Sequence, residues 1–162
     1  MGVLAWIVEG TWPACVDAVR AHVPRETEVV LLHVSDQRLP GVAHGAFAGL
    51  LGRGHHPEHD PGPQLAELGA ASAQELLAAA AQRLGRPCSA IERAGPVERE
   101  VVAAAAAAEL LVVARDGDRS RLGPPSLGPW SRFVVDHAPC PVLLVWPEGA
   151  PDVATLPPPP PH

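Results

Sequence analysis

Aromatic side chains are scarce in this sequence. Phenylalanine and tryptophan together make up 4% of the 162 residues, and there is no tyrosine. Apolar residues nonetheless reach 47%, so the chain is long and apolar enough for one domain with a real core. That core has to be built mainly from valine, leucine, alanine and isoleucine.

Cysteines are also few. Cys15, Cys88 and Cys140 are odd in number, widely spaced and set in apolar surroundings, and no Cys-x-x-Cys pair occurs. We therefore expect neither a disulfide framework nor a cysteine-based metal site. The pattern predicts small buried thiols in a reducing cytoplasm.

An excess of positive charge is missing. The formal net charge is −6, whereas a sequence-independent nucleic-acid binder needs a basic face for phosphates. No uninterrupted apolar run reaches about 20 residues, the length of a membrane span. The first residues, MGVLAWIVEG, carry no basic leader. We expect no nucleic-acid partner, no membrane span and no signal peptide.

Short, nearly continuous apolar runs recur along the chain and are typical of strands buried on both faces of a parallel sheet. They predict strands at residues 3–9, 28–34, 110–114 and 141–146, with a weaker one at 88–93. The intervening stretches have helical periodicity or high helix propensity, and predict helices at 14–23, 64–84, 97–109 and 130–138. This alternation predicts a doubly wound α/β fold: a five-stranded parallel sheet with helices on both faces.

The sequence divides into one domain and a tail. We expect the domain to span residues 1–147, with a flexible His-, Gly- and Pro-rich loop at 35–63 that lacks lasting periodicity. Residues 148–162 end in five prolines and His162. They predict a disordered, solvated extension with no means of packing.

Ligands of doubly wound folds bind beyond the carboxyl ends of the strands. The candidate site is therefore expected in the loops after Glu9, Val34 and Ala114. The last loop, ARDGDRSRLGPPSLGPWS (114–131), runs into a helix start, where proteins often hold phosphate. It carries arginine, aspartate and proline where such cradles use glycine or a hydroxyl.

Three blocks of the sequence share one known pattern. In LGPWSRFVVDHAPCPVLLV, Gly128, Ser131, His137 and the following Ala-Pro-Cys-Pro-Val have its spacing. IVEGT is similar to its Val-Asp-Gly-Ser segment, and AGPVEREVVAAAAAAELLVVA to its Gly-x-Pro turn, third helix and fourth strand. In these blocks the chain resembles the universal stress protein family, up to about Trp146. The resemblance implies a Rossmann-like, adenine nucleotide alpha hydrolase-like fold and a role in stress response.

One branch of that family binds ATP or AMP through Gly-x2-Gly-x9-Gly-Ser/Thr after the fourth strand. Aligning the last glycine with Gly128 places Arg115, Asp118 and Pro129 at the other three positions. A Cβ obstructs close approach of backbone N–H groups to phosphate, and proline has no N–H to offer. We therefore expect tight nucleotide binding to be lost. The opposing feature is the positive charge of Arg115, Arg119 and Arg121, which could grip an anion by side chains.

The resemblance also outlines a candidate nucleotide pocket for ATP or AMP. Its residues are Glu9, Thr11, Val34, Arg115 and Gly128. Glu9 stands where the family has an aspartate near the base.

The loop at 35–63 raises the question of a metal site, because imidazole and carboxylate groups suit zinc or nickel. Its candidate ligands are His44, His55, His56, His59 and Asp60. A Gly- and Pro-rich loop supplies no groups to fix such ligands in place. We therefore predict no metal.

No arrangement for acid–base or nucleophilic catalysis stands out, because no third group completes a nucleophile–base pair around His137 or Cys140. The sequence thus predicts a non-enzymatic, cytoplasmic stress-response scaffold with an unidentified protein partner. It is expected to be a homodimer through the last strand, PVLLVW, at a sheet edge. The alternatives are an ATP- or AMP-binding switch with an atypical arginine-containing loop and, more remotely, a metal-handling protein.

Overall fold

The computed structural model describes residues 2–36 and 61–162, and the side chains of all of these except 61–71. Its sheet has five parallel strands in the order β3-β2-β1-β4-β5. The strands are β1 Val3–Trp6, β2 Val29–Asp36, β3 Ser89–Gly95, β4 Leu110–Ala114 and β5 Val142–Val145. The predicted doubly wound α/β fold is thereby confirmed.

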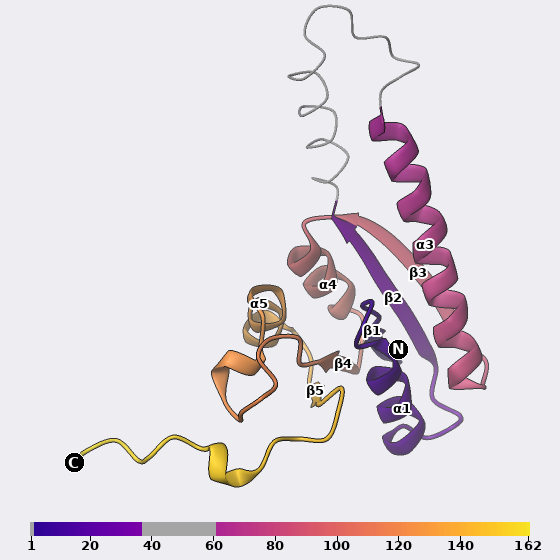
Figure 1. The fold of residues 1–162 in the computed structure, drawn as a ribbon. Coiled ribbons are helices and arrows are strands. Elements are labelled where there is room, and N and C mark those ends of the chain that lie inside the picture. Colours follow the sequence, from indigo (N-terminus) through magenta and orange to yellow (C-terminus); the bar gives the residue numbers. More distant parts are fainter. Residues whose placement is uncertain (1, 37–60) are drawn as a thin grey trace, which may run out of the picture.

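Four helices are described, and they cover both faces of the sheet (Figure 1). They are α1 Trp12–His22, α3 Pro61–Leu84, α4 Val97–Ala105 and α5 Pro129–His137. α1 and α3 pack on one face, and α4 and α5 on the other. In the described parts of the chain, no helix is long and apolar enough to cross a membrane.

The core forms two layers because successive residues of a strand point to opposite faces. Ala5, Ile7 and Leu31 face α1 and α3. Leu4 and Leu32 face α4 and α5 instead. β1, at the centre of the sheet, is buried along its whole length, which is why its sequence is continuously apolar.

The edge strands are less buried, each in its own way. β3 is exposed at most positions, with Ile91 at 37% exposure. β5 is half-buried throughout. β5 therefore lies at a sheet edge, as the sequence predicts.

Some element boundaries differ from expectation. β1 ends at Trp6 rather than at Glu9, because the N–H groups of Thr11 and Trp12 turn back to the carbonyl of Val8. Gly10 makes this turn possible with φ +89°. α1 accordingly begins at Trp12, two residues earlier than expected.

α4 is shorter than its alanine-rich sequence predicts. It ends at Ala105 rather than at residue 109. The N–H of Ala108 bonds to the carbonyl of Ala105, and the N–H of Glu109 bonds to that of Gly2. The chain therefore leaves the helix in order to pair with β1.

The tail makes ordered contacts that the sequence did not reveal. Val153–Thr155 form a 3-10 turn, capped by Asp152, which accepts the N–H of Ala154 at 2.7 Å. The Thr155 hydroxyl accepts the N–H of Leu122 at 3.0 Å. At this turn the tail therefore contacts the loop that follows β4, and the expectation of a disordered tail stays a prediction. The domain boundary near residue 147 stays a prediction.

Candidate functional site

The predicted pocket residues Glu9, Thr11 and Val34 lie near the carboxyl ends of β1 and β2, two strands in the middle of the sheet. Thr11 and Val34 are buried, at 7% and 6% exposure, whereas Glu9 is exposed. Within the described parts of the chain, no hydrogen bond joins these three residues to Arg115 or Gly128. The assignment of the five as one nucleotide pocket stays a prediction.

The loop between β4 and α5, residues 115–128, is closed by its own backbone. The N–H of Gly117 donates to the carbonyl of Ser126 at 2.9 Å, and the N–H of Asp118 donates to that of Pro125 at 2.7 Å. A Cβ at Gly117 would overlap the Pro125 carbonyl oxygen. Two amides that a phosphate cradle would need are therefore already bonded.

The helix start at the end of this loop already holds a carboxylate. Gly128 is the N-cap of α5, and its N–H donates to Oδ1 of Asp116 at 2.7 Å. A helix N-terminus attracts anions because its first N–H groups and its dipole carry partial positive charge. Here a side chain of the same loop occupies that place. Pro129, the first residue of the helix, has no N–H to add.

Arg115, the candidate phosphate ligand, is also engaged. Its Nη1 donates to the Ser126 hydroxyl at 2.5 Å, and that hydroxyl donates to the carbonyl of Gly123 at 2.7 Å. Its guanidinium carbon lies 4.4 Å from the centre of the Trp146 ring, a cation–π contact. The side chain is thus held against β5 and the loop.

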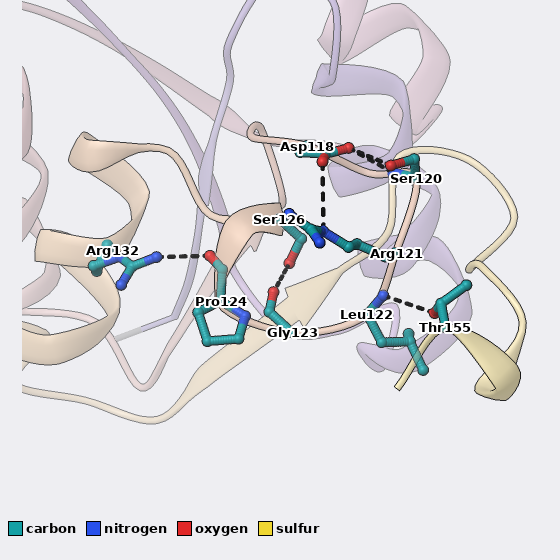
Figure 2. A network of polar contacts seen from close by, with 9 residues as sticks. All are labelled: Asp118, Ser120, Arg121, Leu122, Gly123, Pro124, Ser126, Arg132 and Thr155. Carbon is teal, nitrogen blue, oxygen red and sulfur yellow. Dashed lines mark hydrogen bonds and ion pairs between the residues drawn. The ribbon is translucent and has the colours of Figure 1, made fainter. Parts of the chain in front are cut away.

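The other loop arginines have partners as well. Arg119 Nη2 pairs with Glu148 Oε1 at 2.9 Å, and Arg121 Nε with Asp118 Oδ2 at 3.8 Å. Arg132 Nη2 donates to the Pro124 carbonyl at 2.6 Å. Figure 2 shows the contacts of Arg121 and Arg132, together with those of Gly123 and Thr155.

Asp118 has a further partner in its own loop. Its Oδ1 accepts hydrogen bonds from the hydroxyl and the backbone N–H of Ser120, at 2.6 and 3.0 Å (Figure 2). These bonds, followed by the charge of Arg121, lower the pKa of the Asp118 carboxyl. Asp118 therefore keeps its negative charge in the loop.

The thiols and His137 show no sign of catalysis. Burial raises the pKa of Cys15 to about 12 and also raises those of Cys88 and Cys140, so the unreactive thiol form is favoured. His137 Nδ1 lies 2.7 Å from the carbonyl of Phe133, on whose ring it stacks. It closes the last turn of α5, a structural role.

No metal-binding group of three or more His, Cys, Asp or Glu residues occurs in the parts of the chain that the structure describes. The five candidate ligands of the histidine-rich loop lie outside the described residues. They are His44, His55, His56, His59 and Asp60.

The carboxylate of Asp116 at the helix start is the contact that sequence reasoning missed. An acidic residue two positions after the strand is a visible signal. Its partner lies twelve positions further on, however, and only the path of the loop brings the two together.

Comparison with known proteins identifies both the family and the fold. The sequence pattern described as the universal stress protein family matches residues 9–145. The chain belongs to this family. No curated protein sequence matches it significantly.

Solved structures of universal stress proteins share the fold. UspA from Lactobacillus plantarum has a TM-score of 0.60 at 19% identity, and the match covers 88% of this chain and 95% of that one. A family member from Arabidopsis thaliana with AMP bound has a TM-score of 0.56 at 19% identity, covering 92% and 94%. A universal stress protein in complex with cAMP has a TM-score of 0.54 at 15% identity, covering 91% and 98%.

Proposed function

We propose that this universal stress protein is a non-enzymatic, cytoplasmic scaffold of the stress response whose phosphate loop has lost tight nucleotide binding. One contact carries the proposal, the 2.7 Å hydrogen bond from the Gly128 N–H to the Asp116 carboxylate. A nucleotide phosphate would have to displace this carboxylate from the helix start.

The energetic terms oppose phosphate binding. A charged hydrogen bond is worth about 1.5–3 kcal/mol, and the amides of Gly117, Asp118 and Gly128 are all engaged within the loop. The negative charges of Asp116 and Asp118 would also repel a phosphate. Losses of this size turn a micromolar site into one of millimolar strength or weaker.

Calorimetric titration with ATP–Mg²⁺ tests this proposal. The expected dissociation constant is weaker than about 50 μM. ATP turnover by the same preparation is expected to stay at the level of a buffer blank. A dissociation constant tighter than about 50 μM, or ATP turnover above that of the buffer blank, would overturn the proposal of a non-enzymatic scaffold.

A second candidate is a nucleotide-responsive switch that uses the loop arginines. The family members solved with AMP and with cAMP favour it, as does the side chain of Arg121, which is 60% exposed and paired only at 3.8 Å. An ATP or AMP dissociation constant tighter than about 50 μM that weakens on R121Q would favour this candidate.

We further propose that the scaffold is a homodimer that pairs through β5. Leu111 and Arg115 donate to the carbonyls of Pro141 and Val145, and Leu144 is paired with Val113. Since backbone groups of a parallel strand alternate between its two sides, the N–H and carbonyl of Leu144 face the free edge. An unpaired edge of this kind can join a second copy.

Leu144→Pro removes an edge N–H without breaking the β4–β5 ladder. It is expected to give monomers in analytical ultracentrifugation with thermal unfolding still cooperative. Leu143→Pro is the matched control: it removes a ladder N–H and is expected to unfold the protein. A dimer that persists in folded L144P would place the interface elsewhere.

A further inference from the structure

A second concentration of arginines lies at the opposite end of the sheet from the β4–α5 loop. A cavity of about 480 Å³ opens where α1 and α3 end, near the amino ends of β2 and β3. Its charged lining residues are Asp17, Arg20, Arg25, Arg83 and Arg86. We refer to it as the arginine cavity.

The charge of the arginine cavity is opposite to that of the chain. The protein carries a formal charge of −6, whereas the cavity brings four guanidinium groups together with a single carboxylate. Guanidinium groups stay ionised throughout the physiological pH range. A small anion would therefore find a persistent positive field there.

Two of the four guanidinium groups are fixed in place. Arg83 forms a two-pronged bond with Asp17, with Nε and Nη2 at 2.9 and 2.8 Å from its two carboxylate oxygens. Arg86 donates to the carbonyls of Val23 and Thr27 at 3.1 and 3.2 Å. Each keeps N–H groups beyond those it uses, because a guanidinium has five.

The other two guanidinium groups have no direct contact partner, although the charge of Arg20 helps to lower the pKa of the Asp17 carboxyl. Arg20 and Arg25 are exposed, and they form no hydrogen bond or salt bridge within the described parts of the chain. Arg20 and Arg83 lie in the last turns of α1 and α3, where a favourable interaction with the helix dipole explains the presence of a basic residue. It does not account for Arg25 and Arg86, which lie outside the helices.

We propose that the arginine cavity binds a small phosphate-bearing anion of two or more negative charges. Guanidinium groups match phosphate oxygens in pairs of parallel hydrogen bonds. Arg83 and Arg86, which are already held in position, offer their remaining N–H groups to the anion. The exposed side chains of Arg20 and Arg25 bind it from the solvent side. The site is separate from the nucleotide pocket predicted at the other end of the sheet.

Calorimetry with inorganic pyrophosphate on the full chain, at about 0.15 M ionic strength, tests the proposal. We expect a dissociation constant of about 1 mM or tighter. The double variant R20Q/R25Q, which leaves the bonds of Arg83 and Arg86 intact, is expected to weaken binding by about tenfold or more.

The matched control is R93Q/R99Q, which removes the same charge from arginines outside the cavity. It is expected to leave pyrophosphate affinity within about twofold, because neither arginine lines the cavity and salt screens charges that do not contact the ligand. Binding weaker than about 1 mM would overturn the proposal. So would an equal loss in both double variants, or an unchanged affinity in R20Q/R25Q. The circular dichroism spectra of all variants establish that each is folded.

Discussion

Both ends of the sheet carry arginines, yet those arginines are paired differently. At the carboxyl end, Arg115, Arg119 and Arg121 each have a partner within the loop, β5 or the tail. At the amino end, Arg20 and Arg25 form no hydrogen bond or salt bridge in the described chain, and Arg20 acts on Asp17 only through its charge. We therefore expect the groups that an arginine already contacts, more than its place in a family motif, to decide whether it binds an anion.

The largest effect is expected from restoring the family's phosphate-binding pattern in the β4–α5 loop, at the carboxyl end of the sheet. The variant R115G/D116A/D118G/P129S restores the glycines and the hydroxyl of the family's nucleotide pattern and removes the carboxylate from the helix start. Recovery of two charged hydrogen bonds is worth about 3–6 kcal/mol, so affinity for ATP–Mg²⁺ is expected to rise by at least about a hundredfold. Calorimetry measures it. If affinity stays unchanged in a folded variant, the loop does not limit binding.

A single substitution at the helix start should act in the same direction but less strongly. Asp116→Ala frees the Gly128 N–H and is expected to tighten AMP binding by about tenfold, or about 1.4 kcal/mol. Asp116→Asn keeps an acceptor without its charge and should give a smaller gain. Should the two variants bind AMP equally, the charge of Asp116 would not be the obstacle.

Removal of residues 148–162 should increase the local opening of the β4–α5 loop and leave the rest of the fold unchanged. A chain that stops at Pro147 loses the bonds from Leu122 to Thr155 and from Arg119 to Glu148. Amide hydrogen exchange of Leu122 is expected to accelerate, while the global free energy of unfolding falls by less than about 1.5 kcal/mol. Exchange at residues of the arginine cavity serves as the internal control. Equal acceleration there would mean that the tail supports the whole fold.

The smallest effect concerns acid stability at the amino end. The hydrogen bond from Arg83 lowers the pKa of Asp17 in the folded protein, so folding favours the ionised carboxylate. This stabilisation is fully present above the ordinary carboxyl pKa of about 3.9 and is lost as the pH falls through the lower folded value. Wild type is therefore expected to unfold at a slightly higher temperature than D17N at pH 7. The two melting temperatures should converge as the pH falls below the folded pKa of Asp17, where both side chains are uncharged.

Much of the sheet could be predicted because its chemistry is local. β4 matches its apolar run residue for residue, since a strand buried on both faces leaves no room for polar side chains. β3 gave a weaker signal because it lies at an exposed edge. The end of α4 could not be predicted, because alanine favours helix everywhere and pairing with β1 decides where the chain turns.

The site was predictable only in part. The missing glycines and the proline of the loop are visible in the sequence and indicate poor phosphate binding. The bond between Asp116 and Gly128 is not visible, because it depends on the path of the ten or so intervening residues. The arginine cavity could not be predicted for the same reason. Arg20 and Arg86 are far apart in the chain and come together only where α1 and α3 end.

The strand order has a consequence for synthesis of the protein. β1 is made first and lies in the middle of the sheet, where Val3 pairs with Val29 on one side and Leu110 on the other. Until residue 110 has left the ribosome, the nascent sheet ends in an open, wholly apolar strand. Such strands are where incomplete chains stick to one another. We therefore expect the early polypeptide to be the state of this protein that is most prone to aggregation.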